Sequence, residues 1–319
     1  MTRAMSNVDS PERPPLALIA GPTASGKSDL AVRLAKALEA QGRRGVVINA
    51  DSAQVYADLE ILSARPSVYE MQGVEHRLFG EWDGAQACSA ADWAERARAE
   101  IALAHEHGSV PILVGGTGLY VRTLLDGIAP IPAIDPQVRE AVRDMPLGEA
   151  ALALQAEDPQ RAARLGPTDS ARIRRALEVV RSSGQSLSHW QQQVSGGIGD
   201  SVTLHAAILL PDRAWLYGRC DRRFATMLQR GAIDEVVALL ARQLSPDLPV
   251  MRAIGVPEIV DFLRGTTTLE DVLARGSQST RNYVKRQITW LRHQPPTDWP
   301  RFELEHFNEG DIFASLLRD

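Results

Sequence analysis

The residues best suited to chemistry lie in one short stretch near the start of the chain. Positions 21–28 read G-x-x-x-x-G-K-S; apolar residues 16–20 before them predict a buried strand, and a helix is predicted from about Asp29. A glycine-rich loop between a strand and a helix N-terminus turns backbone N–H groups inward and binds anions. Lys27 adds a point charge, and the Ser28 hydroxyl is placed to ligate Mg²⁺. We therefore predict a phosphate-binding loop, with a chance match on an ordinary strand–turn–helix as the alternative.

Lysine usage supports this prediction. The chain has only three lysines, Lys27, Lys36 and Lys285, and arginine supplies the other 32 of its 35 basic residues. A lysine kept at the motif position indicates that a compact ammonium group is needed there rather than a planar guanidinium.

A carboxylate and a hydroxyl follow two further predicted strands, at 46–50 and 110–114. Ligands of open α/β sheets bind at the carboxyl ends of the strands, so Asp51 and Thr117 are expected at the same edge as the loop. Asp51 could be a general base, a Mg²⁺ partner or a helix N-cap, and Thr117 could bond a ligand or cap the next helix. A nucleotide hydrolase usually places a Mg²⁺-holding Asp at such a strand end. The glycines at 115 and 116 therefore weaken an ATPase interpretation.

Basic charge is concentrated in three segments although the formal net charge is −5. The arginines are Arg161, Arg164, Arg172, Arg174, Arg175 and Arg181 in the first, and Arg219, Arg222, Arg223 and Arg230 in the second; the third holds Arg281, Lys285, Arg286 and Arg292. Together they favour an anionic partner larger than one nucleotide, such as RNA. Each alone is also typical of a solvated helix face.

The order of predicted elements indicates an α/β fold. Strands alternate with helices over 16–125, which predicts a doubly wound, mostly parallel sheet. We expect a disordered leader at 1–14, an α/β core at 15–129 and 201–319 whose C-terminal part is helical, and an all-helical insertion at 130–200. The helices expected in the C-terminal part are 215–230, 233–243, 256–264, 269–275 and 280–292.

Composition excludes several other classes. Cys88 and Cys220 are far apart and lack CxxC spacing, which favours unpaired thiols in a reducing cytosol and no metal site. No apolar run approaches the ~18 residues that a membrane span needs, so we expect a cytoplasmic protein without a membrane partner.

Six motifs together resemble the tRNA dimethylallyltransferase family, also called tRNA isopentenyltransferases, over roughly residues 16–295. They are GPTASGKS (21–28), NADSAQVY (49–56), SAADW (89–93), VGGTGLY (114–120), RALEV (175–179) and KRQITWLR (285–292). Only the first is shared with other phosphate-loop families.

The resemblance implies transfer of a dimethylallyl group from dimethylallyl diphosphate to N6 of the adenosine 3′ of the anticodon, with Mg²⁺ required. It implies Asp51 as base with Thr117 beside it, and the helical insertion as the part that binds the anticodon stem-loop. The implied diphosphate-binding residues are Gly21, Pro22, Thr23, Ala24, Ser25, Gly26, Lys27, Ser28, Arg219 and Arg223. The implied tRNA contacts are Asp51, Ser52, Ala53, Gln54, Thr117, Arg139, Ala171, Arg172, Ile173, Arg174, Arg175, Arg252 and Gly255.

The chain departs from the family pattern at a few positions. Arg65 stands where relatives often have lysine, Ala171 begins a stretch that is usually Q-R-L-x-R, and Val256-Pro257 replaces an aromatic–basic pair. We expect a monomer that uses dimethylallyl diphosphate and tRNA. The alternatives are a P-loop nucleoside or small-molecule kinase and a non-catalytic RNA-binding module.

Overall fold

The computed structural model describes residues 13–303 and 308–318. The expected leader at 1–14 therefore lies outside the described residues except for Arg13 and Pro14, whose carbonyl oxygens accept hydrogen bonds from Thr203 Oγ1 and N at 3.0 and 2.9 Å. The chain forms two compact units, one running to Thr123 and resuming at Gly199, the other spanning Leu124–Ile198.

The first unit is built on a parallel sheet. Among the described residues it has six strands in the order β3 (Glu75–Arg77), β2 (Gly45–Asn49), β4 (Val110–Gly115), β1 (Pro15–Ala20), β7 (Thr203–Leu209) and β8 (Arg301–Phe302). Every pairing is parallel. The predicted α/β class with a doubly wound sheet is confirmed. The short edge strands β3 and β8 were not predicted, because neither has an apolar run.

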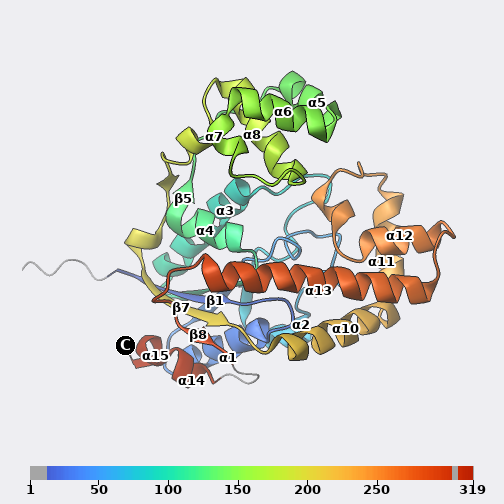
Figure 1. Ribbon diagram of the computed structural model, residues 1–319. Helices are drawn as coiled ribbons and strands as arrows, with labels where there is room; N and C mark the ends of the chain where they lie inside the picture. The colour runs from blue at the N-terminus through green and yellow to red at the C-terminus, as the bar shows by residue number, and fades with distance from the viewer. Residues whose placement is uncertain (1–12, 304–307, 319) are drawn as a thin grey trace, which may run out of the picture. The chain divides into compact units, whose positions relative to one another are not determined.

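Helices cover both faces of this sheet (Figure 1). On one face, α1 (Lys27–Glu39) packs with α14 (Glu309–Ile312) and α15 (Ala314–Arg318) over the side chains of β1 and β4. On the other face lies α3 (Ala90–Glu106), whose N-cap Ser89 forms a capping box with Asp92. The fully buried Trp93 of α3 donates a 2.9 Å hydrogen bond from Nε1 to the carbonyl of Asn49. This bond fixes α3 against the end of β2, directly before Asp51.

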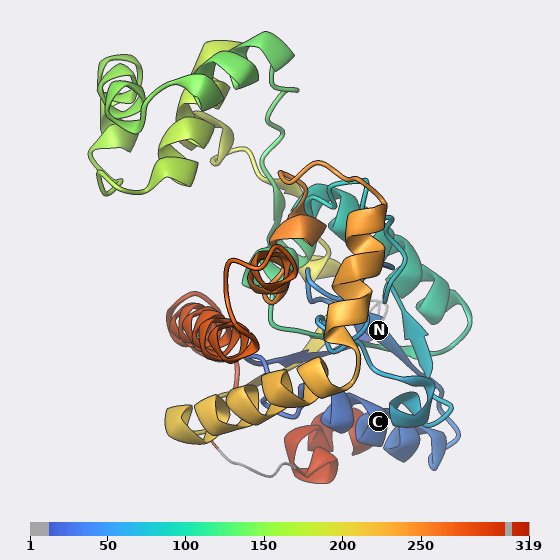
Figure 2. The same ribbon diagram turned by 90° about the vertical axis from the view of Figure 1, so that its right-hand side faces the viewer.

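The rest of the first unit is mostly helical, as predicted. It contains α10 (Arg213–Gln229), α11 (Ala232–Ala241), α12 (Val256–Leu263) and α13 (Leu269–His293), and α13 lies beside α10 in both views (Figure 2). The smaller elements are α2 (Val68–Met71), α4 (Gly118–Asp126), η1 (Gly199–Ser201) and η2 (Pro249–Arg252). The prediction of two helices at 269–275 and 280–292 is wrong, because α13 is continuous. Gly276 is not a break: a Cβ there would lie 2.1 Å from Phe224 Cζ, so the glycine permits close packing on α10.

The second unit has its own helical core. It comprises α5 (Pro136–Asp144), α6 (Leu147–Glu157), α7 (Pro159–Ala162), α8 (Ser170–Ser183) and α9 (Leu187–Trp190). Val142, Leu154 and Leu177 are buried together in it. The antiparallel pair β5 (Gly127–Ile128) and β6 (Ser195–Gly196) joins the two ends of the unit. The unit thus begins at Leu124 and ends at Ile198, against the expected 130 and 200.

Within the part of the chain that is described, none of the helices combines the length and the apolar character needed to span a bilayer.

Candidate active site

The loop after β1 has the shape of an anion cradle. Ala24 and Gly26 both have left-handed backbones, with φ of 65° and 92°, and α1 begins directly afterwards at Lys27. Left-handed geometry is costly for a residue with a Cβ, and such strain is typical of functional loops. The Ser25 hydroxyl is buried and has no hydrogen-bond partner among the described residues. The predicted strand, loop and helix are therefore present, and one polar group of the loop is left for a ligand.

Gln287 of α13 links this loop to the end of β4. Its Oε1 accepts a 2.9 Å hydrogen bond from Thr23 N, and its Nε2 donates a 3.2 Å bond to the carbonyl of Gly116. The side chain is buried. Gln287 lies in the motif KRQITWLR, but the sequence alone assigns it no role, because a residue 264 positions away from Thr23 gives no local signal.

Three cations gather at the loop. The Arg219 Nε donates a 3.0 Å bond to the carbonyl of Ala24, and its guanidinium lies 4.6 Å from the Trp215 ring. Burial lowers the pKa of Lys27, an effect that Asp51 opposes and Arg223 reinforces. Burial also lowers the pKa of Arg223. Because these groups are partly desolvated and near one another, they favour a multiply charged anion as ligand.

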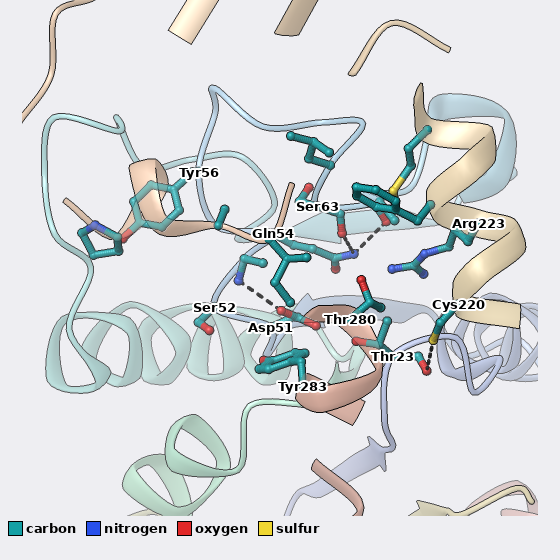
Figure 3. Close-up of a pocket in the computed structure, with 18 of the residues that line it drawn as sticks. Thr23, Asp51, Ser52, Gln54, Tyr56, Ser63, Cys220, Arg223, Thr280 and Tyr283 are labelled. Carbon is teal, nitrogen blue, oxygen red and sulfur yellow. Dashed lines mark hydrogen bonds between the residues drawn. The ribbon is translucent and has the colours of Figure 1, made fainter. Parts of the chain in front are cut away.

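One cavity connects this cationic loop to Asp51. Its volume is about 350 Å³. Its walls come from the phosphate loop, the segment after β2, α10, the region around η2, and α13 (Figure 3). In the figure, Arg223 reaches into the cavity from α10, and Thr280 and Tyr283 approach it from α13. Lys27, Ser28, Asp51 and Arg223 therefore share one space.

Asp51 is buried and held by its neighbours. Its Oδ1 accepts a 3.1 Å bond from Ala53 N, and its own N–H donates a 2.8 Å bond to Asn49 Oδ1. The residues after Asp51 form turns rather than a helix, so the N-cap alternative is wrong. The carboxylate is instead part of the cavity wall.

Thr117 contacts Ser52 rather than Asp51. Its Oγ1 accepts a 2.9 Å bond from Ser52 N and donates a 3.2 Å bond to Ser52 Oγ. Tyr283 of α13 also hydrogen-bonds with Thr117 and Ser52. Burial and the nearby Asp51 raise the pKa of Tyr283, and these hydrogen bonds only partly oppose the rise. The Thr117 hydroxyl therefore orients the turn that carries Asp51. Thr117 also directly precedes α4, where its carbonyl accepts bonds from Tyr120 N and Val121 N at 2.9 and 3.3 Å, so it caps that helix through its backbone while its hydroxyl bonds Ser52. Tyr283 is a site residue that sequence analysis missed.

The implied tRNA contacts in the first unit differ in how accessible they are. Ser52, Ala53, Gln54 and Arg252 line the cavity. The amide of Gln54 already bonds the carbonyls of Ser63 and Ala64 at 3.1 and 2.7 Å. Gly255 is buried with φ of 98°, and its N–H donates to Glu258 at 3.0 Å.

The second unit presents most, not all, of the basic residues predicted to contact RNA. Arg139, Ala171 and Arg172 are exposed, and Arg175 is partly exposed. Arg174 is partly committed, because its guanidinium donates a 3.0 Å bond to the carbonyl of Met145. The prediction for Ile173 is not supported: its side chain is 3% exposed in the core, and its N–H bonds the carbonyl of Asp169.

The remaining groups of interest are side chains that could bind a metal ion and the two cysteines. No group of three or more His, Cys, Asp or Glu side chains that could hold a metal ion occurs in residues 13–303 and 308–318. Cys88 and Cys220 are both free, which confirms that they are unpaired. Cys220 lines the cavity, with its Sγ 4.0 Å from the Thr23 carbonyl.

The fold and the cavity define a P-loop α/β protein whose phosphate site opens onto a buried carboxylate. Comparison with known proteins identifies the family. The protein-family model described as IPP transferase matches residues 54–294 of this chain. The tRNA dimethylallyltransferase of Erythrobacter litoralis is 65% identical over 96% of this chain and 97% of its own length. That of Zymomonas mobilis is 51% identical over 98% and 99%.

Solved structures agree. The full-length tRNA isopentenylpyrophosphate transferase of Bacillus halodurans is similar with a TM-score of 0.66 and 32% identity, covering 95% of this chain and 94% of that one. A eukaryotic dimethylallyltransferase described as acting on tRNA gives a TM-score of 0.73 at 27% identity, covering 87% and 70%. This chain belongs to the IPP transferase family, which confirms the resemblance found in its sequence.

Proposed function

We propose that this protein transfers the dimethylallyl group of dimethylallyl diphosphate to N6 of the adenosine 3′ of the anticodon in tRNA. The observation that supports this most strongly is the single cavity that joins a cationic phosphate loop to the buried carboxylate of Asp51. The relatives named tRNA dimethylallyltransferase support the substrates.

The cationic end of the cavity suits the leaving group. When the C1–O bond of the donor breaks, its electron pair goes to the diphosphate oxygen. Lys27, Arg219, Arg223 and the N-terminal amides of α1 are positioned to stabilise that charge. Preorganised donors of this kind usually give the largest contribution to catalysis.

The carboxylate suits the acceptor. The exocyclic amine of adenine is a poor nucleophile because its lone pair is delocalised. As N6 bonds to C1, Asp51 takes the proton from N6, which is worth roughly 10²–10⁴ in rate. Asn49 and the turn at 51–53 hold Asp51, and Thr117 holds that turn through Ser52.

The residues of the loop fit a magnesium ion. The Ser28 hydroxyl is an oxygen donor on the cavity, next to where the diphosphate oxygens would lie, and Mg²⁺ commonly binds through few protein groups together with substrate phosphates. When bound, the ion supplies Lewis-acid stabilisation of the leaving diphosphate.

The adenosine must leave its base stack to reach the cavity, at a cost of a few kcal/mol that is smallest for a loop nucleotide. Exposed arginines of the second unit, such as Arg139 and Arg172, suit contacts with the phosphate backbone. We further expect a monomer working in the cytoplasm, where tRNA is found.

The kinase alternative is not favoured, and transfer assays separate the two functions. The protein is incubated with Mg²⁺, unmodified tRNA and radiolabelled dimethylallyl diphosphate, and in parallel with ATP. Label in the tRNA, mapped to the adenosine 3′ of the anticodon, supports the proposal. ATP turnover without labelled tRNA would overturn it in favour of a kinase, and salt-sensitive tRNA binding without any transfer would favour a binding module.

A further inference from the structure

One wall of the cavity changes from charged to apolar along α10. Cys220, Arg223, Phe224 and Met227 line the cavity with the i, i+3, i+4, i+7 spacing of one helix face. Figure 3 shows Cys220 and Arg223 at the charged end of this face. At 1.5 Å per residue, the face extends about 10 Å from Cys220 to Met227. A donor whose diphosphate lies at Arg223 would direct its hydrocarbon toward Phe224.

Two glycines fix the position of the Phe224 ring. A Cβ on Gly276 of α13 would lie 2.1 Å from Phe224 Cζ. A Cβ on Gly255 would lie 3.2 Å from Phe224 Cε2 and 2.6 Å from Leu62 Cδ2. Glycine is unfavourable inside a helix, so Gly276 has a packing reason to be there. The ring has no room to move toward either element.

Two carboxylates hold the neighbouring walls. Glu235 accepts a 2.9 Å bond from Leu62 N with one oxygen, and bonds of 2.6 and 2.8 Å from Glu60 N and Ile61 N with the other. Glu258 accepts from Gly255 N at 3.0 Å and from Ser279 Oγ at 2.8 Å. Leu62 and Gly255 are thus tied down in the region that packs against Phe224, so this part of the cavity wall is held in place.

We propose that Phe224 determines the length of the prenyl group, admitting five carbons and excluding ten. The inference rests on the proposed function. A geranyl chain would place additional carbons where the Phe224 ring lies, and a close-packed wall accepts added methylenes only with strain. The ring is 3% exposed, so it is a packed part of the cavity wall rather than a mobile surface group.

The test compares dimethylallyl diphosphate with geranyl diphosphate, using unmodified tRNA, for the wild type, Phe224→Leu and Phe224→Ala. We expect the wild type to prefer the shorter donor by at least 100-fold in kcat/KM, and the variants to lower this ratio at least tenfold by gaining activity with the longer donor. Phe302→Ala is the matched control, because Phe302 packs against a different core cluster. It should leave the ratio unchanged.

A substitution on α13 tests the same wall by moving the Phe224 ring toward the cavity instead of removing it. Gly276→Ala should drive Phe224 into the cavity and raise KM for dimethylallyl diphosphate at least tenfold, and Gly276→Ala combined with Phe224→Leu should restore it. An unchanged donor ratio in folded Phe224 variants that still use dimethylallyl diphosphate would overturn this inference alone. Absence of transfer from either donor by the wild type would overturn the proposed function and this inference with it.

Discussion

The backbone N–H of Thr23 donates a 2.9 Å hydrogen bond to Oε1 of Gln287. The contact joins the phosphate loop to the middle of α13, and the same side chain also binds the carbonyl of Gly116. The helix thereby adds a second link between the loop and the end of β4, which the 3.2 Å bond from Gly21 N to the carbonyl of Gly115 also joins.

Replacing Gln287 with Leu should loosen the loop. Thr23 N and Gly116 O would both lose their partner while remaining buried, which costs about 1–3 kcal/mol each. We expect a lower melting temperature and a higher KM for dimethylallyl diphosphate. The exposed Gln278→Leu on the same helix is the control. Equal behaviour of the two variants would show that the Gln287 bonds do not hold the loop.

Asp51→Asn should block the chemical step and spare donor binding. An amide can still accept the bond from Ala53 N, but it cannot take a proton from N6. We expect single-turnover transfer to fall roughly 10²–10⁴-fold, with pyrophosphate affinity retained. Asp29→Asn, at an exposed position of α1, serves as the control. A rate within a few-fold of wild type would remove Asp51 as the base.

Cys220 should report on occupancy of the phosphate site and on pH. Burial raises the pKa of its thiol, although Arg223, Lys27 and Arg219 nearby lower it. The thiol is therefore protonated near neutrality, and the thiolate fraction grows about tenfold for each pH unit below the pKa. In a Cys88→Ser background, iodoacetamide labelling should speed up as pH rises, and inorganic pyrophosphate should slow it. A labelling rate of Cys220 that does not change when pyrophosphate is added would show that the diphosphate binds elsewhere.

Exposed arginines of the second unit should carry tRNA affinity. Replacing Arg172 and Arg175 with Ala removes two charges, together with the ion pairs that Arg172 makes with Asp169 at 3.0 Å and Arg175 makes with the buried Glu178 at 3.6 Å. The salt dependence of tRNA binding, plotted logarithmically, should become shallower by about one for each phosphate group that the variant no longer neutralises, while donor affinity stays the same. Arg174→Ala should instead lower the melting temperature, because its guanidinium holds the carbonyl of Met145. A salt slope unchanged in the double variant would locate the RNA on another surface.

Local sequence signals predicted the parts of the site that are contiguous in the chain. The glycine spacing at 21–28 and the apolar run before Asp51 each define structure within about ten residues. These signals were enough to predict the inner strands of the sheet and to place the loop at the carboxyl ends of those strands.

Long-range packing explains what was missed. One predicted helix ended at 275, and the contact with the ring of Phe224 shows why Gly276 lies inside a continuous helix instead. Gln287 contacts the phosphate loop and Tyr283 contacts Thr117 and Ser52 because α13, which is distant in sequence, packs beside both segments. Ile173 was included with its arginine neighbours, although its place on the apolar face of α8 buries it.

The central claim is that the phosphate loop receives the diphosphate as Asp51 accepts the proton from an adenosine amine. The most direct measurement is the stoichiometry of one reaction with unmodified tRNA, Mg²⁺ and dimethylallyl diphosphate, counting released pyrophosphate and prenylated adenosine together. We predict one pyrophosphate for each N6-prenylated adenosine in the wild type, and both products reduced in parallel by roughly 100-fold or more with Asp51→Asn. Prenylated adenosine formed without pyrophosphate, or undiminished formation by Asp51→Asn, would contradict the account.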